Sequence, residues 1–379
     1  MAMAKETKVR REPLLHITKR DTMPFWRAFG IRVIAVLAAL VVAGILTVLL
    51  TGLNPIEVYR SLFDGTFATE DNLFVCLRDT ALLLCIALAV TPAFKMRFWN
   101  IGAEGQVLAG ALGCAAIMLE FGDSGIPEPL LILIMLVTSI LAGALWGVIP
   151  AIFKALFGTN ETLFTLMMNY IIMNIISFCI IFFGWENSMG SGTIGIINLM
   201  TRRGWLPAIL DNQYVLTILL VLIITVLMYI YLRFSKHGYE ISVVGESEKT
   251  ARYVGIGVGK VIIRTMLLSG AICGFVGFLM VGGVNHTVYT GLAGGMGFTA
   301  IMVSWLAKFN PFIMIGTSFM IVFLEKGADE IASQFRLNSA FADILTGIII
   351  FFIIGCEFFI NYRIHVRRSH KSVKEAENA

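Results

Sequence analysis

Charged residues are scarce in this chain, and that scarcity excludes an ordinary soluble domain. They make up 14% of the 379 residues, against 58% for hydrophobic residues. Soluble domains carry about 25% charged residues. The composition is therefore typical of a polytopic membrane protein. The formal net charge is only +4, and it gives no reason to expect a nucleic acid as a partner.

Motifs for metal binding, redox chemistry and nucleotide binding are also missing. The six cysteines form no CxxC pair and fall in apolar stretches, where cysteine serves as a small packing residue. Gly259-Lys260 is followed by Val261 instead of Ser or Thr, and Val254 stands where a phosphate loop has its first glycine. We therefore expect no metal site, no ATP site and no catalytic residues in this chain.

Long apolar stretches are what the chain has in abundance. A bilayer core of about 30 Å is crossed by about 20 apolar residues in a helix. Because backbone groups in lipid must be satisfied within the segment, helices are the only reasonable interpretation of these stretches. The fold class is thus an all-α polytopic membrane protein with about ten spans, near residues 31–50, 73–94, 102–119, 130–156, 162–183, 213–233, 262–282, 297–308, 312–325 and 340–361.

Lysine and arginine orient these spans. Most of the 29 lie before the first span, after the last, or in every second connection between them. The positive-inside rule then places both termini in the cytoplasm. The predicted division is a basic cytoplasmic segment at 1–30, a transmembrane domain at 31–361 with a large cytoplasmic loop at about 234–261, and a cytoplasmic tail at 362–379.

The stretch FWNIGAEGQVLAGALG, residues 98–113, brings polar side chains to the start of a span. A carboxylate at membrane depth costs about 2.5–3.5 kcal/mol on insertion scales, so Glu104 needs water, a partner or a function. Asn100, Glu104 and Gln106 are therefore candidates for the lining of a substrate pathway. The alternative for Glu104 is a helix-start carboxylate stabilised by the helix dipole, worth about 0.3–1 kcal/mol.

A polar stripe marks the span that begins near residue 162. Glu161, Thr165 and Asn169 are spaced by four, and Asn174 lies close by. Polar stripes inside membranes either hold helices together or line a pathway. A stripe with a carboxylate and several amides favours the pathway, so Glu161, Asn169 and Asn174 join the candidates.

Three further segments carry expectations. Residues 246–254 suit a short cytoplasmic helix that ends before Gly255. Gly270 and Gly274 form a small-xxx-small pair that permits close helix contact. The long external connection at 184–212 is a candidate docking surface or gate.

The glycine-rich helix starts at 98–113 and 291–306 face opposite sides of the membrane. Spans two to five and seven to ten could therefore form inverted repeats. In transporters with such repeats, short or broken helices point their N-termini at a central site.

Four runs in this order resemble one family: FWNIGAEGQVLAGALG, GTNETLFTLMMNYI, VGESEKTARYVGI and GMGFTAIMVSWL. They are similar to the permease subunits of bacterial ABC importers for nucleosides, relatives of the ribose and branched-chain amino acid permeases. The resemblance covers about residues 75–310. Ser304 and Trp305 depart from it, because small and aliphatic residues are commoner there.

The resemblance implies a permease of the bacterial cytoplasmic membrane that carries no cofactor itself. It implies a second, homologous permease as heterodimer partner, cytoplasmic ATP-binding subunits that use ATP and magnesium, and an extracytoplasmic solute-binding lipoprotein. The loop at Gly245–Gly255 looks like the segment that couples to the ATPase. The implied coupling residues are Gly245, Glu246, Thr250, Ala251 and Gly255.

The resulting hypothesis is a permease that moves a nucleoside, or a related sugar-like solute, inward by alternating access driven by a partner ATPase. Glu104, Gln106, Asn169 and Asn174 would exchange hydrogen bonds with ribose hydroxyls or base edges. The alternative is an ion-coupled secondary transporter with Glu104 as its proton site. An intramembrane transferase is disfavoured, because Glu104 has no acidic neighbour within several residues.

Overall fold

The described residues fold mostly into helices, as the composition predicts. A computed structural model describes residues 15–20, 23–186, 193–209 and 212–366. The elements, in order, are β1 (Leu15–Lys19), α1 (Phe25–Thr51), α2 (Pro55–Phe67), α3 (Glu70–Lys95), α4 (Ala103–Phe121), α5 (Glu128–Phe157), α6 (Glu161–Phe182), α7 (Val215–Phe234), α8 (Lys236–Glu246), α9 (Glu248–Tyr253), α10 (Val258–Met280), the π-helical turn η1 (Val281–Asn285), α11 (Met296–Leu306), α12 (Pro311–Gln334), α13 (Ser339–Asn361) and β2 (Tyr362–Val366).

Within the described residues, nine helices are long and apolar enough to cross a membrane. The tenth expected span is α11, an apolar helix of 11 residues. At about 1.5 Å per residue it reaches roughly 16 Å, half of a bilayer core. The class of polytopic α-helical membrane protein is therefore confirmed, with one span that reaches only halfway.

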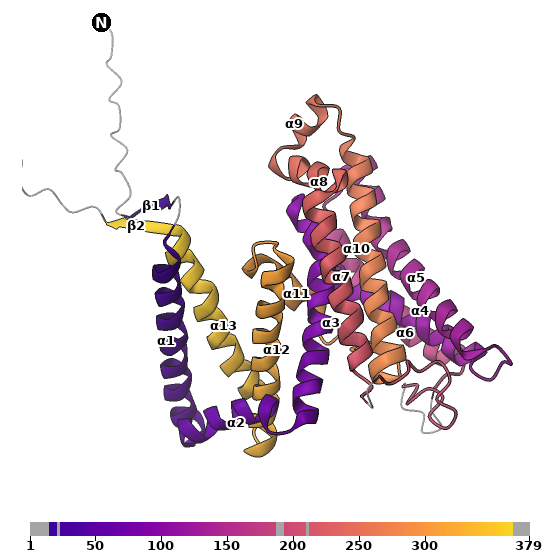
Figure 1. Ribbon diagram of the computed structural model, residues 1–379, viewed down its shortest axis with the longest axis horizontal. Coiled ribbons are helices and arrows are strands. Elements are labelled where there is room, and N and C mark those ends of the chain that lie inside the picture. Colours follow the sequence, from indigo (N-terminus) through magenta and orange to yellow (C-terminus); the bar gives the residue numbers. More distant parts are fainter. Residues whose placement is uncertain (1–14, 21–22, 187–192, 210–211, 367–379) are drawn as a thin grey trace, which may run out of the picture. The chain divides into compact units, whose positions relative to one another are not determined.

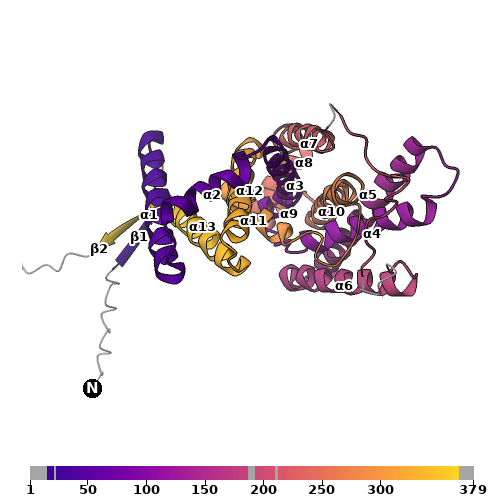
Figure 2. The same cartoon turned by 90° about the horizontal axis from the view of Figure 1, so that it is seen from below.

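Two structural units emerge from the contacts. One comprises residues 63–327, and the other comprises residues 1–62 together with 328–379. In the larger unit, α3 and α10 form the centre, with 72% of each span buried, whereas α5 and α7 are each 28% buried and face outward. Figures 1 and 2 show α10 lying among α3, α4 and α5. The short helices α8 and α9 lie together at one end of this bundle, which we name the α8–α9 end.

Glycines bring α4, α5 and α10 into backbone contact. A Cβ added to Gly274 of α10 would lie 2.2 Å from the carbonyl oxygen of Ser139 on α5. A Cβ on Gly270 would lie 2.3 Å from the carbonyl oxygen of Gly143, also on α5, and one on Gly110 of α4 would lie 2.4 Å from Gly274 Cα. The predicted small-xxx-small contact of Gly270 and Gly274 is thereby confirmed.

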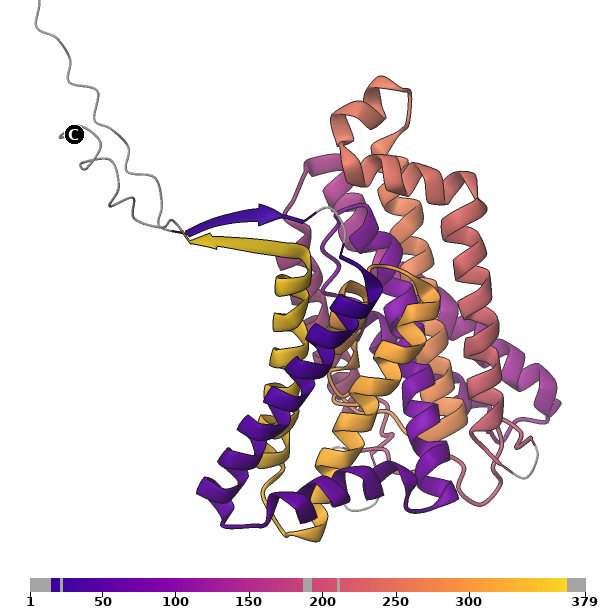
Figure 3. The ribbon, with the colours of Figure 1, turned by 60° about the vertical axis from the view of Figure 1, so that its left-hand side comes forward.

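In the smaller unit, α1 packs against α13, and the strands β1 and β2 pair antiparallel at the same end of these helices (Figure 3). The register places Thr18 opposite Arg363. The sequence predicted plain basic segments at 1–30 and 362–379, and neither strand was expected. The first helix also begins at Phe25, inside the predicted N-terminal segment. Residues 1–14 and 367–379 lie outside the described residues.

Candidate functional site

The connection between α3 and α4 enters the helix bundle. Asn100 is fully buried, and its Nδ2 donates to Ser269 Oγ at 3.2 Å, about halfway along α10. Irregular backbone at membrane depth is tolerated only where protein surrounds it and satisfies its polar groups. Asn100 helps to meet this requirement locally, because its Oδ1 accepts from the backbone N–H of Gly102 at 3.0 Å and from Gln106 Nε2 at 3.2 Å.

Two side chains of the polar stripe on α6 form hydrogen bonds with backbone groups of this connection and of the start of α4. Asn169 Nδ2 donates to the carbonyl oxygen of Ile101 at 2.9 Å, and its Oδ1 accepts from the backbone N–H of Gly105 at 2.9 Å. The hydroxyl of Thr165 accepts from the backbone N–H of Ile101 at 3.2 Å. Both side chains are buried. In this conformation Thr165 and Asn169 of the stripe hold the loop in place, a structural role that the sequence pattern favoured less than pathway lining.

Glu104 joins the start of α4 to the start of α11. Its two carboxylate oxygens accept from the backbone N–H groups of Gly295 and Gly297, each at 2.8 Å, and the residue is 3% exposed. A Cβ on Gly297 would lie 2.4 Å from the Glu104 backbone nitrogen, so only glycine permits this approach. The N-termini of two helices, each carrying about half a positive charge, thus meet around one carboxylate.

The remaining pathway candidates lie apart from this cluster. Glu161 pairs with Lys154 at 2.7 Å, between the end of α5 and the start of α6. Asn174 is exposed, and its Nδ2 donates to the carbonyl oxygen of Tyr170 within α6. The structure therefore brings together Asn100, Glu104, Gln106 and Asn169. It also adds Ser269 to the cluster. Nothing in the sequence was a reason to select Ser269, because it is a lone serine in an apolar span.

The candidate coupling segment folds as two short helices. Ser247 is the N-cap of α9, where its side chain accepts from the Thr250 backbone N–H at 3.2 Å, and Gly255 follows with a positive φ of 82°. The short helix predicted at 246–254 is thus found at Glu248–Tyr253, whereas α8 was not expected. Tyr253 is 92% exposed, and sequence reasoning missed it, although a tyrosine in so polar a segment was a usable signal.

The five coupling candidates divide by exposure. Glu246, Thr250 and Gly255 are exposed and available to a partner. Gly245 and Ala251 are buried. A Cβ on Gly245 would lie 2.0 Å from the Lys95 carbonyl oxygen, so Gly245 packs α8 onto the end of α3.

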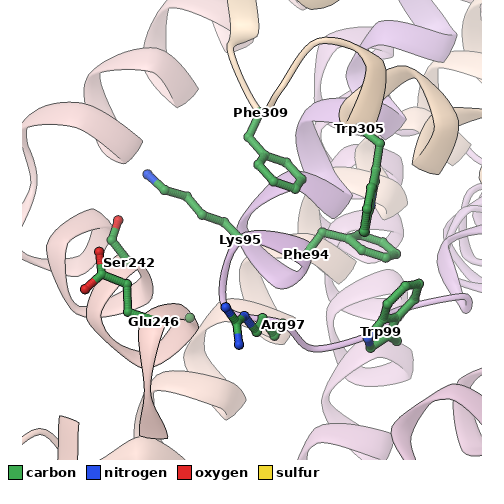
Figure 4. Close-up of a pocket in the computed structure, with 9 residues that line it drawn as sticks. Phe94, Lys95, Arg97, Trp99, Ser242, Glu246, Trp305 and Phe309 are labelled. Carbon is green, nitrogen blue, oxygen red and sulfur yellow. The ribbon is translucent and has the colours of Figure 1, made fainter. Parts of the chain in front are cut away.

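A cavity of about 490 Å³ opens at the α8–α9 end. Figure 4 shows aromatic side chains on one side of it and two α8 side chains on the other. The ring centroids of Trp99 and Trp305 are 5.6 Å apart, and Phe94 lies edge-on to both. The lining residues are Phe94, Lys95, Arg97, Trp99, Ser242, Gly245, Glu246, Trp305 and Phe309.

The connection at the opposite end of the bundle is ordered by charged and amide side chains. Glu128 accepts from the backbone N–H of Gly204 at 2.6 Å and contacts Arg203 Nε at 3.4 Å. Asn198 Nδ2 donates to the carbonyl oxygen of Met118 at 3.0 Å. This segment, at 193–209, is the described part of the predicted docking surface; residues 187–192 and 210–211 lie outside the described residues.

We expect His286 to make the stability of the protein depend on pH. Its ring stacks on Trp205 at 3.7 Å, and burial lowers its pKa below the usual 6.5. As pH falls through about 6.5, the unfolded chain takes up a proton before the folded protein does, so the free energy of unfolding falls until the folded pKa is reached. We expect the melting temperature to decrease between pH 7.5 and 5.

The variant His286→Asn tests this assignment, because asparagine tolerates the left-handed φ of 51° found here but does not titrate. Its melting temperature should vary less over the same pH range than that of the wild type. Equal pH slopes for the two proteins would contradict the role of His286.

Comparison with known proteins agrees with this architecture. Residues 72–354 match the family model described as the permease component of branched-chain amino acid transport systems. A glucose ABC transporter permease of Haloferax volcanii is 28% identical over 93% of this chain and 94% of its own length. A guanosine ABC transporter permease of Bacillus subtilis is 30% identical over 82% and 89%, and a nucleoside ABC transporter permease of Lactococcus lactis is 29% identical over 82% and 86%.

No solved structure matches. The family model covers most of the chain, from the third residue of α3 through α12 and most of α13. The alignments cover 94%, 86% and 89% of the relatives' own lengths, so the similarity is not confined to one segment. The chain therefore belongs to the family of ABC transporter permeases that includes the permease components of branched-chain amino acid transport systems.

Proposed function

We propose that this permease moves a nucleoside inward across a bacterial cytoplasmic membrane, with both chain termini in the cytoplasm. A nucleoside permease and a guanosine permease are among its relatives. The observation that carries the choice of solute is the Trp99–Trp305 pair at the cavity, because planar bases stack on aromatic rings. The glucose permease relative makes a sugar the second candidate.

The partners we propose follow from the family. A second, homologous permease would form a heterodimer with this chain, and ATP-binding subunits would dock at the α8–α9 end. A solute-binding lipoprotein would dock at the opposite end, on the segment at 193–209. The chain itself contributes no cofactor in this proposal, since ATP and magnesium belong to the partner subunits.

The hydrogen bonds of the buried polar cluster suggest how its residues act in the proposed pathway. Asn100, Glu104, Gln106 and Asn169 are buried, and each uses its side chain to hold the α3–α4 connection or the start of α11. We propose that they act on transport by fixing these helix starts, and that any exposure to solute comes with the change of access. Glu161 and Asn174, outside the cluster, stay candidates for the edge of the pathway.

Reconstituted transport tests the solute and the energy source together. Proteoliposomes that contain the complete complex, with binding protein on one side and ATP on the other, should accumulate labelled guanosine. A non-hydrolysable ATP analogue should abolish uptake, and a protonophore should not. Uptake that needs no ATP and collapses with the protonophore would support the ion-coupled alternative, whereas ATP-driven uptake of glucose alone would support a sugar importer.

Docking of the ATPase is tested by cross-linking. A cysteine at Thr250, which is exposed on α9, should cross-link to an ATP-binding subunit in the intact complex. A cysteine at Asp123, exposed in the connection after α4 at the opposite end, is the matched control and should not. Five of the six native cysteines are buried, so their background reaction should be low. Capture of the ATPase from Asp123 but not from Thr250 would refute this arrangement.

A further inference from the structure

The cavity at the α8–α9 end has two chemically different walls. One wall consists of Phe94, Trp99, Trp305 and Phe309, whose rings form a continuous set with neighbouring centroids 5.6–6.3 Å apart. The other is the polar side of α8, with Ser242 and Glu246. Figure 4 shows Lys95 and Arg97 between the two walls. Pockets of about 300–1,000 Å³ with apolar walls and a few convergent polar groups are typical small-molecule sites.

The charged groups of this cavity have no partner in the part of the chain that the structure describes. Among the described residues, Lys95, Arg97 and Glu246 make no hydrogen bond or ion pair through their side chains. Three partly buried cations of the same unit are paired: Lys154 with Glu161, Arg203 with Glu128 and Arg264 with Glu240. Donors and an acceptor are therefore left available in the cavity, on the same side of the aromatic wall.

The backbone at the cavity is held in an uncommon conformation at two places. Arg97 and Phe309 both have a φ of 61°, in the left-handed region that non-glycine residues seldom occupy. Each follows the end of a helix, α3 and α11 respectively. Such conformations cluster at binding sites, where the surrounding structure maintains them. Here the two conformations place the guanidinium of Arg97 and the ring of Phe309 at the same cavity.

We propose that this cavity is a solute site, in which a planar heterocycle carrying a hydroxylated sugar rests at the α8–α9 end of the permease. The heterocycle stacks against Trp99 and Trp305. Lys95 and Arg97 donate to its ring acceptors, and Glu246 accepts from sugar hydroxyls. This inference rests on the proposed function and deepens it, because it gives the permease its own contact with the solute, separate from the binding protein.

Glu246 gives the site a connection to the ATPase side. It lines the cavity and ends α8, and α9 begins two residues later. An occupant that contacts Glu246 therefore touches the helix pair proposed to dock the ATPase. The position is suited to a solute on its way out of the pathway.

Equilibrium binding of labelled guanosine to the purified complex, without binding protein, tests the site. Trp305→Leu and Trp99→Leu should each weaken binding about tenfold, which is the effect of losing one base–aromatic stack. Trp185→Leu, at the opposite end of the bundle, is the matched control and should bind like the wild type. Guanosine affinity that is unchanged in both cavity variants overturns the proposal.

Arg97→Gly separates binding from folding. Glycine accepts the left-handed conformation without cost, so the variant should melt at or above the wild-type temperature while binding guanosine more weakly. Arg202→Gly is its control: Arg202 also has a positive φ, 52°, but lies in the connection at the opposite end. Weaker binding in both variants, or in neither, overturns the role of Arg97.

Measurements on the wild-type complex distinguish a failure of the proposed cavity site from a failure of the proposed function. Wild-type uptake of guanosine together with unchanged binding in the cavity variants would refute the site and leave the proposed function standing. ATP-driven uptake of glucose with no binding or uptake of guanosine would refute both.

Discussion

The variant Glu104→Ala should be among the most destabilised single substitutions in this protein. It leaves the backbone N–H groups of partly buried Gly295 and buried Gly297 without their acceptors. Hydrogen bonds to a charged group contribute about 1.5–3 kcal/mol each. We therefore expect a loss of about 3 kcal/mol in the free energy of unfolding, and a marked fall in the melting temperature of the purified complex.

Glu104→Gln should be intermediate, because an amide retains one acceptor oxygen but turns an N–H₂ group toward the second backbone donor. The control is Glu161→Gln, which breaks the partly exposed pair with Lys154 and should cost about 0–1 kcal/mol. If Glu104 acted only by touching solute, Glu104→Gln would raise the KM for uptake and leave the melting temperature unchanged. That result would refute the bracing role.

The variant Gly274→Val should prevent normal packing of the central helices. Its Cβ would have to lie 2.2 Å from the carbonyl oxygen of Ser139, which is backbone and cannot rotate away as a side chain would. Inserting bulk into a well-packed core typically costs about 1–3 kcal/mol. We expect at least the upper end of this range, since α5 must move as a whole, and hence little folded protein in detergent extracts.

The matched control is Gly316→Ala, in α12, where an added Cβ would meet nothing within 4 Å. Alanine also forms helix better than glycine, by about 0.5–1 kcal/mol, so this variant should be as stable as the wild type or slightly more so. Fluorescence-detected gel filtration with a temperature series measures both variants. A Gly274→Val protein that elutes and melts like the wild type would show that the helices are not in backbone contact.

The spans were predictable because the requirement behind them is local. Backbone groups in lipid must bond within their own segment, so an apolar run of sufficient length can only be a helix. The expected span at 162–183 corresponds to α6 at Glu161–Phe182, and the one at 213–233 corresponds to α7 at Val215–Phe234. Gly255, just after the helix predicted at 246–254, marked the end of α9 for the same reason.

The roles of the polar residues were not predictable in this way. A buried amide that lines a pathway and one that braces a loop have the same sequence pattern. Asn169 was favoured as lining, and only the structure places its side chain against Ile101 and Gly105, 68 and 64 positions away in the sequence. Likewise, the sequence assigned Lys95 and Arg97 only a role in orienting the spans across the membrane. The structure shows that they line a cavity together with Trp305 and residues of α8.

The sequence by itself determined the class of the protein, its spans and, through four motifs, its family. Composition and apolar length are properties of single segments, and they carry that information without reference to the rest of the chain. Only the tertiary structure decided what Glu104 does, because its partners, Gly295 and Gly297, lie more than 190 positions away and no local pattern joins them. The meeting of two helix N-termini around one carboxylate depends on that long-range contact.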